Sequence, residues 1–302
     1  MRSPSFLRLI LLLFLIGAAW GLSVPLAKIA VSTGHGPFGL IMWELIFATL
    51  VLGVVTLIRG KLFQISRHRL ILFAVVGLTG TVLPGAFSYT AAAQLPAGVM
   101  AIVIALVPLC ALPIAILLKL ETPNFQRFFG VLLGSLAVVL IVGPQDALPD
   151  PSKASFVLIA LIAPFFYAIE TNYVSWKGTF GLDPVQTLFG SSFVALLCTI
   201  PLVWQGDEWI NPLDPWGAAE WSLLGLSALH VSAYCAYIWL VGKAGSVFAS
   251  QVAYLVTIFG VLWSISLLSE GYSTWIWASL VTLLIGVALV LPNPKLQDLP
   301  QE

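Results

Sequence analysis

The chain has 302 residues, of which 60% are hydrophobic and 9% charged, and its formal net charge is zero. Soluble domains carry about 25% charged residues, so this composition excludes an ordinary soluble protein and indicates an all-α integral membrane protein. A neutral chain gives no reason to expect a nucleic-acid partner. The cysteines, Cys110, Cys198 and Cys235, lie in apolar runs without metal-ligand spacing, and we predict neither a metal nor a cofactor.

Apolar runs separated by glycine, proline and charged residues predict ten transmembrane helices, since a spanning helix needs about 20 apolar residues. The first run follows Arg2 and Arg8, as in a signal peptide, but it continues beyond Trp20, and we interpret it as the first span. The predicted spans are 8–31, 38–58, 70–93, 97–118, 125–143, 154–176, 185–204, 219–241, 246–268 and 273–291.

The distribution of lysine and arginine predicts the orientation, because cytoplasmic loops carry an excess of both. With the N-terminus inside, eleven of the 13 basic residues are cytoplasmic, and the two outside are Lys28 and Lys153. We therefore expect both termini in the cytoplasm. Short loops without a eukaryotic targeting signal favour a bacterial inner membrane.

The second half of the chain weakly repeats the first, at offsets of 147 to 149 residues. The pairs are Trp20 with Tyr167, Gly34 with Gly181, Pro37 with Pro184, Tyr89 with Tyr237 and Glu121 with Glu270. Halves of five spans each enter the membrane in opposite directions, so we predict two inverted five-helix repeats, a feature of secondary transporters. The predicted repeats are residues 1–145 and 154–292, followed by a cytoplasmic tail, 293–302.

Several of these segments resemble proteins with two EamA domains, within the drug/metabolite transporter superfamily. The resemblance is carried by AAWGLSVPLAK at 18–28, by ALVPLCALPIAILLKLE at 105–121, and by Gln126, Gly130, Gly134, Glu270 and Gly286. It implies a central cavity between two five-helix halves and the efflux of amino acids or other small metabolites. The chain departs from the pattern in its second span, where Glu44 lies in a region that often carries a basic residue.

Ionisable side chains inside spans are costly and mark candidate sites. Glu170 is the first candidate for binding an amine or a proton, on a helix that also bears Tyr167 and Asn172. The eighth span has a polar stripe formed by Ser227, His230, Tyr234 and Tyr237. We predict that Glu170 and His230 couple transport to protons, because histidine titrates near neutral pH. The structural alternatives are a Glu170–Lys177 ion pair and a His230 that only donates a structural hydrogen bond.

The remaining candidates for substrate binding come from four other spans. Glu44 is a second possible cavity carboxylate, or else the partner of Lys28 or His35. Polar and aromatic residues that share helix faces complete the predicted site: Trp20 and Ser23, Gln251 and Tyr254, and Tyr89. Packing is the alternative for each aromatic residue.

Small residues and prolines complete the pattern. Gly17-xxx-Gly21 and Gly130-xxx-Gly134 permit close helix contact, either within one chain or in a homodimer. Pro25, Pro84, Pro108, Pro113 and Pro164 lie inside spans, where they bend helices.

The sequence contains no Walker A motif and no GxSxG, HExxH or His/Cys cluster, so we expect no ATP hydrolysis and no enzyme activity. The favoured function is a secondary transporter of neutral, zwitterionic or cationic metabolites, with a small-molecule substrate and the lipid bilayer as its partners. A non-transporting membrane sensor or assembly protein is the alternative, and an intramembrane enzyme that uses Glu170, His230 and Glu44 is a third.

Overall fold

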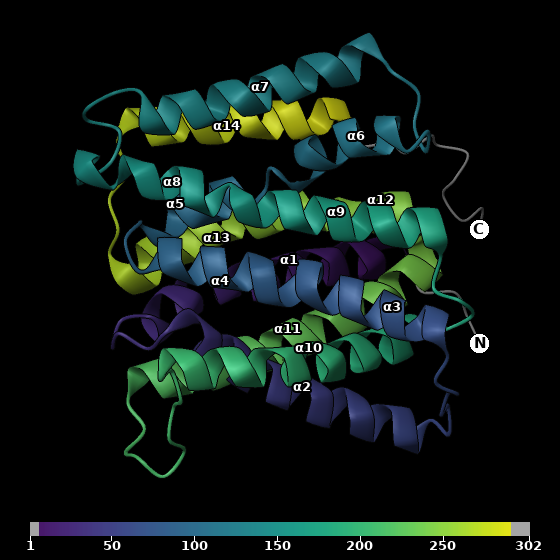
Figure 1. The fold of residues 1–302 in the computed structure, drawn as a ribbon. Coiled ribbons are helices and arrows are strands. Elements are labelled where there is room, and N and C mark those ends of the chain that lie inside the picture. Colours follow the sequence, from purple (N-terminus) through teal and green to yellow (C-terminus); the bar gives the residue numbers. More distant parts are fainter. Residues whose placement is uncertain (1–5, 291–302) are drawn as a thin grey trace.

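The computed structural model describes residues 6–290, apart from the side chains of Phe6, Ser246 and Val247, and consists of ten helical spans (Figure 1). The predicted tail at 293–302 lies outside the described residues, as do Arg2 and Lys295. In chain order, the spans are formed by α1 (Phe6–Ala30); α2 (Pro37–Ile58); α3 (Arg67–Gly77), a π-helix (Leu78–Val82) and α4 (Leu83–Ala92); α5 (Ala97–Ile104) and α6 (Val107–Leu117); α7 (Phe125–Val142); a 3-10 turn (Pro151–Lys153), α8 (Ala154–Ala160) and α9 (Ile162–Lys177); α10 (Pro184–Gly206); α11 (Ala218–Ala244); α12 (Ser246–Ser250) and α13 (Val252–Leu268); and α14 (Thr274–Val290).

The ten spans confirm the predicted fold class. In the described part of the chain, nine helices are long and apolar enough to cross a membrane, and α14 is a shorter apolar helix of 17 described residues. The span limits agree with the predicted ones within three residues. The agreement follows from the need for about 20 apolar residues in each span and for polar punctuation between spans.

The repeat-related residues shape the same turn in both halves. Gly34 and Gly181 both have positive φ angles, +83° and +77°, which glycine adopts without strain. Three residues later, Pro37 and Pro184 are the first residues of α2 and α10, where their missing N–H groups cost nothing. The two turns lie at opposite ends of the bundle, as expected of inverted halves (Figure 1).

Charge divides the bundle into two ends. The acidic end consists of the loops 31–36, 93–96, 143–153, 207–217 and 269–273, and the basic end of the loops 59–66, 118–124, 178–183 and 245 (Figure 1). Of the described lysines and arginines, two (Lys28 and Lys153) lie at the acidic end and the others at the basic end.

Loops of one half hold the helix starts of the other at both ends of the α2–α10 pair. At the acidic end, Glu208 accepts hydrogen bonds from the N–H groups of Phe38 and Gly39. At the basic end, Asp183 caps α10 and pairs with Arg59 and Lys61, at 2.8 and 3.3 Å. Partial burial tends to raise the pKa of Asp183, but hydrogen bonds from Gln186, Arg59 and Lys61 lower it overall.

Small residues bring helices of the two halves into close contact. Gly130 of α7 and Gly286 of α14 face each other, and a Cβ added at Gly130 would lie 2.6 Å from the Gly286 carbonyl oxygen. Cβ atoms added at Gly17 and Gly21 of α1 would lie 2.3 and 2.8 Å from the Cβ atoms of Leu255 and Phe259 of α13. Both small-residue motifs therefore serve packing within one chain, and a homodimer would need other surfaces.

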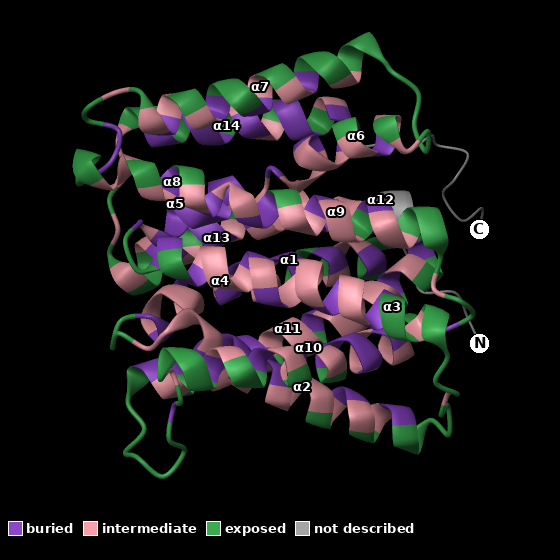
Figure 2. Ribbon diagram, viewed as in Figure 1, coloured by how far each residue is buried: buried purple, intermediate pink, exposed green. Residues whose placement is uncertain are grey.

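Large apolar side chains cover the outer faces of the bundle. On α7, for example, Leu132, Leu136 and Val139 are exposed while Gly130 and Gly134 face inward (Figure 2). Hydrocarbon chains are the medium that accepts such a surface.

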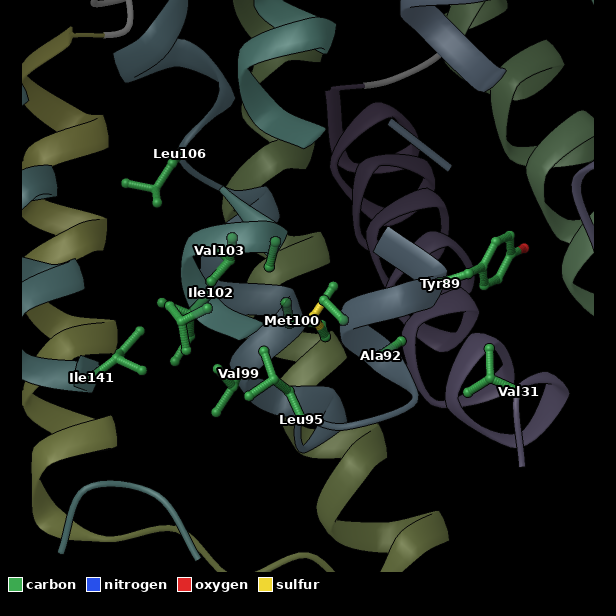
Figure 3. Close-up of a cluster of buried hydrophobic side chains, with 14 of the residues drawn as sticks. Val31, Tyr89, Ala92, Leu95, Val99, Met100, Ile102, Val103, Leu106 and Ile141 are labelled. Atoms are coloured by element: carbon green, nitrogen blue, oxygen red, sulfur yellow. The ribbon is translucent and has the colours of Figure 1, made fainter. Parts of the chain in front are cut away.

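The most deeply buried region surrounds α5 at the acidic end. Every residue from Ala97 to Val103 is buried, and Val99, Met100 and Ile102 pack with Leu95 and Ile141 (Figure 3). The fourth span breaks after α5 at Ala105 and Leu106, just before Pro108, so α6 runs as a separate segment.

Because the Gly130–Gly286 contact has no room for a side chain, we expect Gly130→Ala to lower the free energy of unfolding by about 1–3 kcal/mol, through overpacking. The measurement is the thermal unfolding midpoint of the protein in detergent. Gly242→Ala is the matched control, since no other atom lies within 4 Å of a Cβ added there. A Gly130→Ala protein as stable as Gly242→Ala would contradict the packing described for α7 and α14.

Candidate functional site

A cluster of ionisable and aromatic side chains lies inside the bundle, where spans from the two halves meet. Glu44 comes from α2, Tyr167 and Glu170 from α9, and His230 and Tyr234 from α11. His230 Nδ1 lies 3.3 Å from Glu44 Oε2. Tyr167 is within electrostatic reach of both Glu44 and Glu170, and Tyr234 is within reach of Glu170. These five residues form the central cluster.

Glu170 lies against the π-helix of the third span. A Cβ added at Gly80 would be 3.1 Å from Glu170 Cγ, so the glycine makes room for this side chain. Glu170 forms no hydrogen bond or ion pair with another described residue. The alternative partner Lys177 instead lies over the Trp176 ring, at 3.4 Å from its centroid. Single π-helical turns inside helices occur frequently at functional sites.

Glu44 and His230 form an ion pair that joins the two halves, provided that the histidine is protonated. The proposed structural partners of Glu44 are engaged elsewhere: Lys28 donates to the Ala92 carbonyl at 2.7 Å, and His35 lies 2.7 Å from Glu220. The alternative that pairs Glu44 with Lys28 or His35 is therefore wrong for this conformation, because both of those side chains lie at the acidic end.

The residues of the polar stripe on α11 differ in burial and in packing partners along the helix. Ser227 is buried and its hydroxyl donates to the Leu223 carbonyl, so it is satisfied within the helix. The His230 side chain is 40% exposed although it lies near the middle of α11. Tyr237, further toward the basic end, packs edge-to-face on Trp20, with ring centroids 6.0 Å apart. The stripe therefore extends the central cluster toward the basic end.

The remaining predicted site residues have partners outside the central cluster in this conformation. The Ser23 hydroxyl donates to the Trp20 carbonyl. Asn172 is buried and donates to the carbonyls of Ala168 and Ala111, which ties α9 to α6. Tyr89 of α4 is a buried member of the core, and its ring points away from the α5 residues (Figure 3).

Two predicted residues come from the ninth span. Gln251 lies at the junction of α12 and α13, and Tyr254 is partly buried in the first turn of α13. Neither belongs to the central cluster as defined above.

Gly80 was not among the predicted site residues, because its role depends on a neighbour 90 residues away in the chain. The segment LTGTVLPG at 78–85 combines two glycines and a proline inside an apolar span, a pattern that indicates an irregular helix.

The cluster is acidic, with two carboxylates and one histidine. All described lysines and arginines lie in loops or in the end turns of helices. Within the described residues, no group of three or more His, Cys, Asp or Glu side chains is arranged to hold a metal ion. The arrangement suits recognition of a solute by charge, hydrogen bonds and aromatic faces.

If His230 faces water inside the bundle, a cysteine at that position will react with a water-soluble maleimide. We expect labelling of His230→Cys and none of Ser227→Cys, which lies one turn away and is buried. Both variants are made in a background in which Cys110, Cys198 and Cys235 are replaced by alanine, and labelling is followed by intact mass. Equal lack of reaction at both positions would show that His230 has no access to water.

Comparison with known proteins identifies the family. The model of the EamA-like transporter family matches residues 7–143 and again residues 154–291. No curated protein matches the chain. A solved crystal structure, described only as that of a protein, has the same fold, with a TM-score of 0.61 at 18% identity over 92% of this chain and 96% of that one. The family consists of membrane transporters and not enzymes, which confirms the expectation that this chain is a transporter-family protein and not an enzyme. Since its model matches both halves of the chain, this protein belongs to the EamA-like transporter family.

Proposed function

We propose that the protein is a secondary transporter that exports amino acids or related neutral, zwitterionic or cationic metabolites by alternating access. The observation that carries this proposal is the central cluster, in which Glu44 of the first half pairs with His230 of the second and Tyr167 lies near both Glu44 and Glu170. Inverted-repeat transporters bind their substrates where the repeats meet, near the bilayer midplane. Trp20, Ser23, Tyr89, Asn172, Gln251 and Tyr254 complete the proposed substrate-binding set, together with Tyr167 and Tyr234.

The charge of the cluster supports this class of solute. Glu44 is already opposite His230, whereas Glu170 has no cationic partner among the described residues. An ammonium group beside Glu170 would supply the missing charge, and the rings of Tyr167 and Tyr234 would offer it their faces. An anionic solute such as a sugar phosphate would add charge of the same sign.

The energy source that we propose is a gradient, since the chain has no Walker A motif. Glu170 and His230 are the candidates for proton coupling. A carboxyl and an imidazole that share a cavity can exchange a proton for a cationic solute, which keeps the cavity near neutrality.

We further propose an inner-membrane location with both termini in the cytoplasm and with the repeats bounded at 1–145 and 154–292. The charge asymmetry supports this orientation, because the basic end carries all described lysines and arginines except Lys28 and Lys153.

In liposomes, the wild-type protein is expected to show saturable flux of amino acids or amines. Glu170→Gln should lower that flux about tenfold or more, because the lost charge-assisted contact is worth about 1.5–3 kcal/mol. Asp214→Asn is the control, since this carboxylate lies in an exposed loop, where it accepts a hydrogen bond from the Asn211 side chain. Wild-type flux in Glu170→Gln would contradict the role of Glu170.

An imposed pH gradient separates two modes of transport. Flux that responds to the gradient supports proton coupling through Glu170 and His230, and flux that ignores it supports solute exchange or facilitated diffusion. Lack of saturable flux for any amino acid, amine or nucleobase by the folded protein would contradict transport and favour a sensor.

The orientation has its own test in intact bacterial cells. A cysteine at Leu213, which is 90% exposed at the acidic end, should react with a membrane-impermeant maleimide added from outside. A cysteine at Thr122, at the basic end, should react only after the cells are opened. The reverse pattern would place the termini outside.

A further inference from the structure

Glu270, in the loop between α13 and α14, reaches across to the start of α5 in the other half. Its two carboxylate oxygens accept hydrogen bonds from the N–H groups of Ala97 and Gly98, at 2.8 and 3.2 Å. The Tyr272 hydroxyl accepts a bond from the same Gly98 N–H, at 3.0 Å, and donates one to Glu270. We call these four residues the acidic-end latch.

The acidic-end latch is favourable for two reasons. A helix start leaves N–H groups free and carries partial positive charge, which a carboxylate neutralises. Burial and the hydrogen bond to Glu270 raise the pKa of Tyr272, so its hydroxyl remains a donor. Next to the latch, a Cβ added at Gly260 of α13 would lie 2.9 Å from the Ala101 Cβ, so α5 and α13 are in close contact.

Beyond the break between α5 and α6, at Ala105 and Leu106, the fourth span diverges from α13. Its second segment, α6, packs chiefly against α9, where Asn172 donates to the Ala111 carbonyl. The latch therefore holds the fourth and ninth spans together at the acidic end, through α5 and α13.

The internal repeat assigns a counterpart to each part of the latch. The offset of 149 residues that relates Glu121 to Glu270 also relates Ala97 to Ser246, and these two residues begin α5 and α12. Helix α12 continues through Gln251 into α13 as a single span. Inverted symmetry thus predicts that Glu121 can cap the start of α12 at the basic end.

In this conformation, the contact that the structure describes for Glu121 is with Arg127 and not with a helix start of the opposite half. Its Oε2 lies 2.7 Å from Arg127 Nη1 on α7, and its side chain is 46% exposed. Glu270 therefore caps a helix at the acidic end, whereas its counterpart at the basic end, Glu121, is paired with Arg127.

Two other pairs of repeat-related spans are held without this asymmetry. The α2–α10 pair is held at both ends, by Glu208 at one and by Asp183 at the other. The α7–α14 pair is fixed by the close contact of Gly130 and Gly286. The asymmetry between Glu270 and Glu121 is therefore a feature of the fourth and ninth spans that these two pairs do not share.

We propose that Glu270 and Glu121 are paired positioning residues that alternate during transport, each closing one end of the cavity by capping a helix of the opposite half. In this structure, Glu270 closes the acidic end. In the opposite state, Glu270 releases α5, and Glu121 leaves Arg127 to accept the first N–H groups of α12. The inference rests on the proposed transport function, but its test reads conformation as well as flux.

A small cavity marks where the acidic end would open. It has a volume of about 270 Å³ and is lined in part by Lys28, Gln94, Pro96, Asp150 and Glu270. Release of Glu270 from α5 would free one wall of this cavity and extend it inward along the fourth span.

The test is double electron–electron resonance on the full chain in lipid nanodiscs, with the native cysteines replaced by alanine. One pair of spin labels, at Gln94 and Thr274, reports the acidic end, and a second pair, at Thr122 and Lys243, reports the basic end; all four side chains are exposed. Flux is measured on the same variants without labels.

Glu270→Gln removes the charge of the latch, so we expect longer distances at the acidic end and shorter ones at the basic end. Arg127→Gln frees Glu121 and leaves the latch residues unchanged. It should also lengthen the distance at the acidic end and shorten the distance at the basic end. Glu121→Gln should keep the present conformation, and flux should fall in both glutamate variants because one state is lost. Glu208→Gln is the matched control: it also caps a helix start at the acidic end, but in a pair held at both ends, and should leave both distances unchanged.

Unchanged distances in a folded Glu270→Gln protein would overturn the role of the latch. If that variant does not fold, Arg127→Gln decides, and unchanged distances there would overturn the pairing with Glu121. A shift of similar size in Glu208→Gln would show general loosening and would likewise count against the proposal. Absence of flux in the wild type, together with the expected distance changes, would refute the transport function while supporting the paired carboxylates.

Discussion

The first turn of every helix leaves N–H groups without partners, and lipid cannot supply them. In this protein, carboxylates supply several of these partners: Asp183 caps its own helix, whereas Glu208 and Glu270 reach helices of the opposite half. Each such contact satisfies a local need and also fixes how two distant segments lie relative to each other. The relative placement of the halves therefore depends on a few charged residues at the ends of an otherwise apolar bundle.

The inability of lipid to solvate polar groups also explains which ionisable side chains lie in the middle of the bundle. Basic side chains lie at the ends, where they meet water and headgroups, and the described spans keep Glu44, Glu170 and His230 inside. Glu44 and His230 compensate each other across the halves. Glu170 lies beside a π-helical turn in which Gly80 leaves space for it. A carboxylate in that setting is suited to bind and release a solute, because no permanent partner has to be displaced.

Much of the candidate site was predictable from spacing along a helix. Tyr167 and Glu170 share a face of one span, and His230 and Tyr234 share a face of another, so their proximity within each helix follows from helical geometry. Contacts between spans were not predictable in the same way. The Glu44–His230 pair joins residues 186 positions apart, and Asn172 and Tyr89 turned out to contact neighbouring helices. The sequence marks these residues as polar or aromatic but does not say which helix each one meets.

The sequence by itself determined the membrane class, the ten spans and the pairing of the two halves, because these depend on local quantities: runs of apolar residues, polar punctuation and matching glycine and proline positions. Only the tertiary structure decided which of two symmetry-related carboxylates caps a helix. Glu121 and Glu270 are equivalent in the repeat, yet Glu270 binds the start of α5 while Glu121 binds Arg127. The physical reason is that a cap between the halves depends on the distance between spans far apart in the chain, and that distance is a property of the packed conformation.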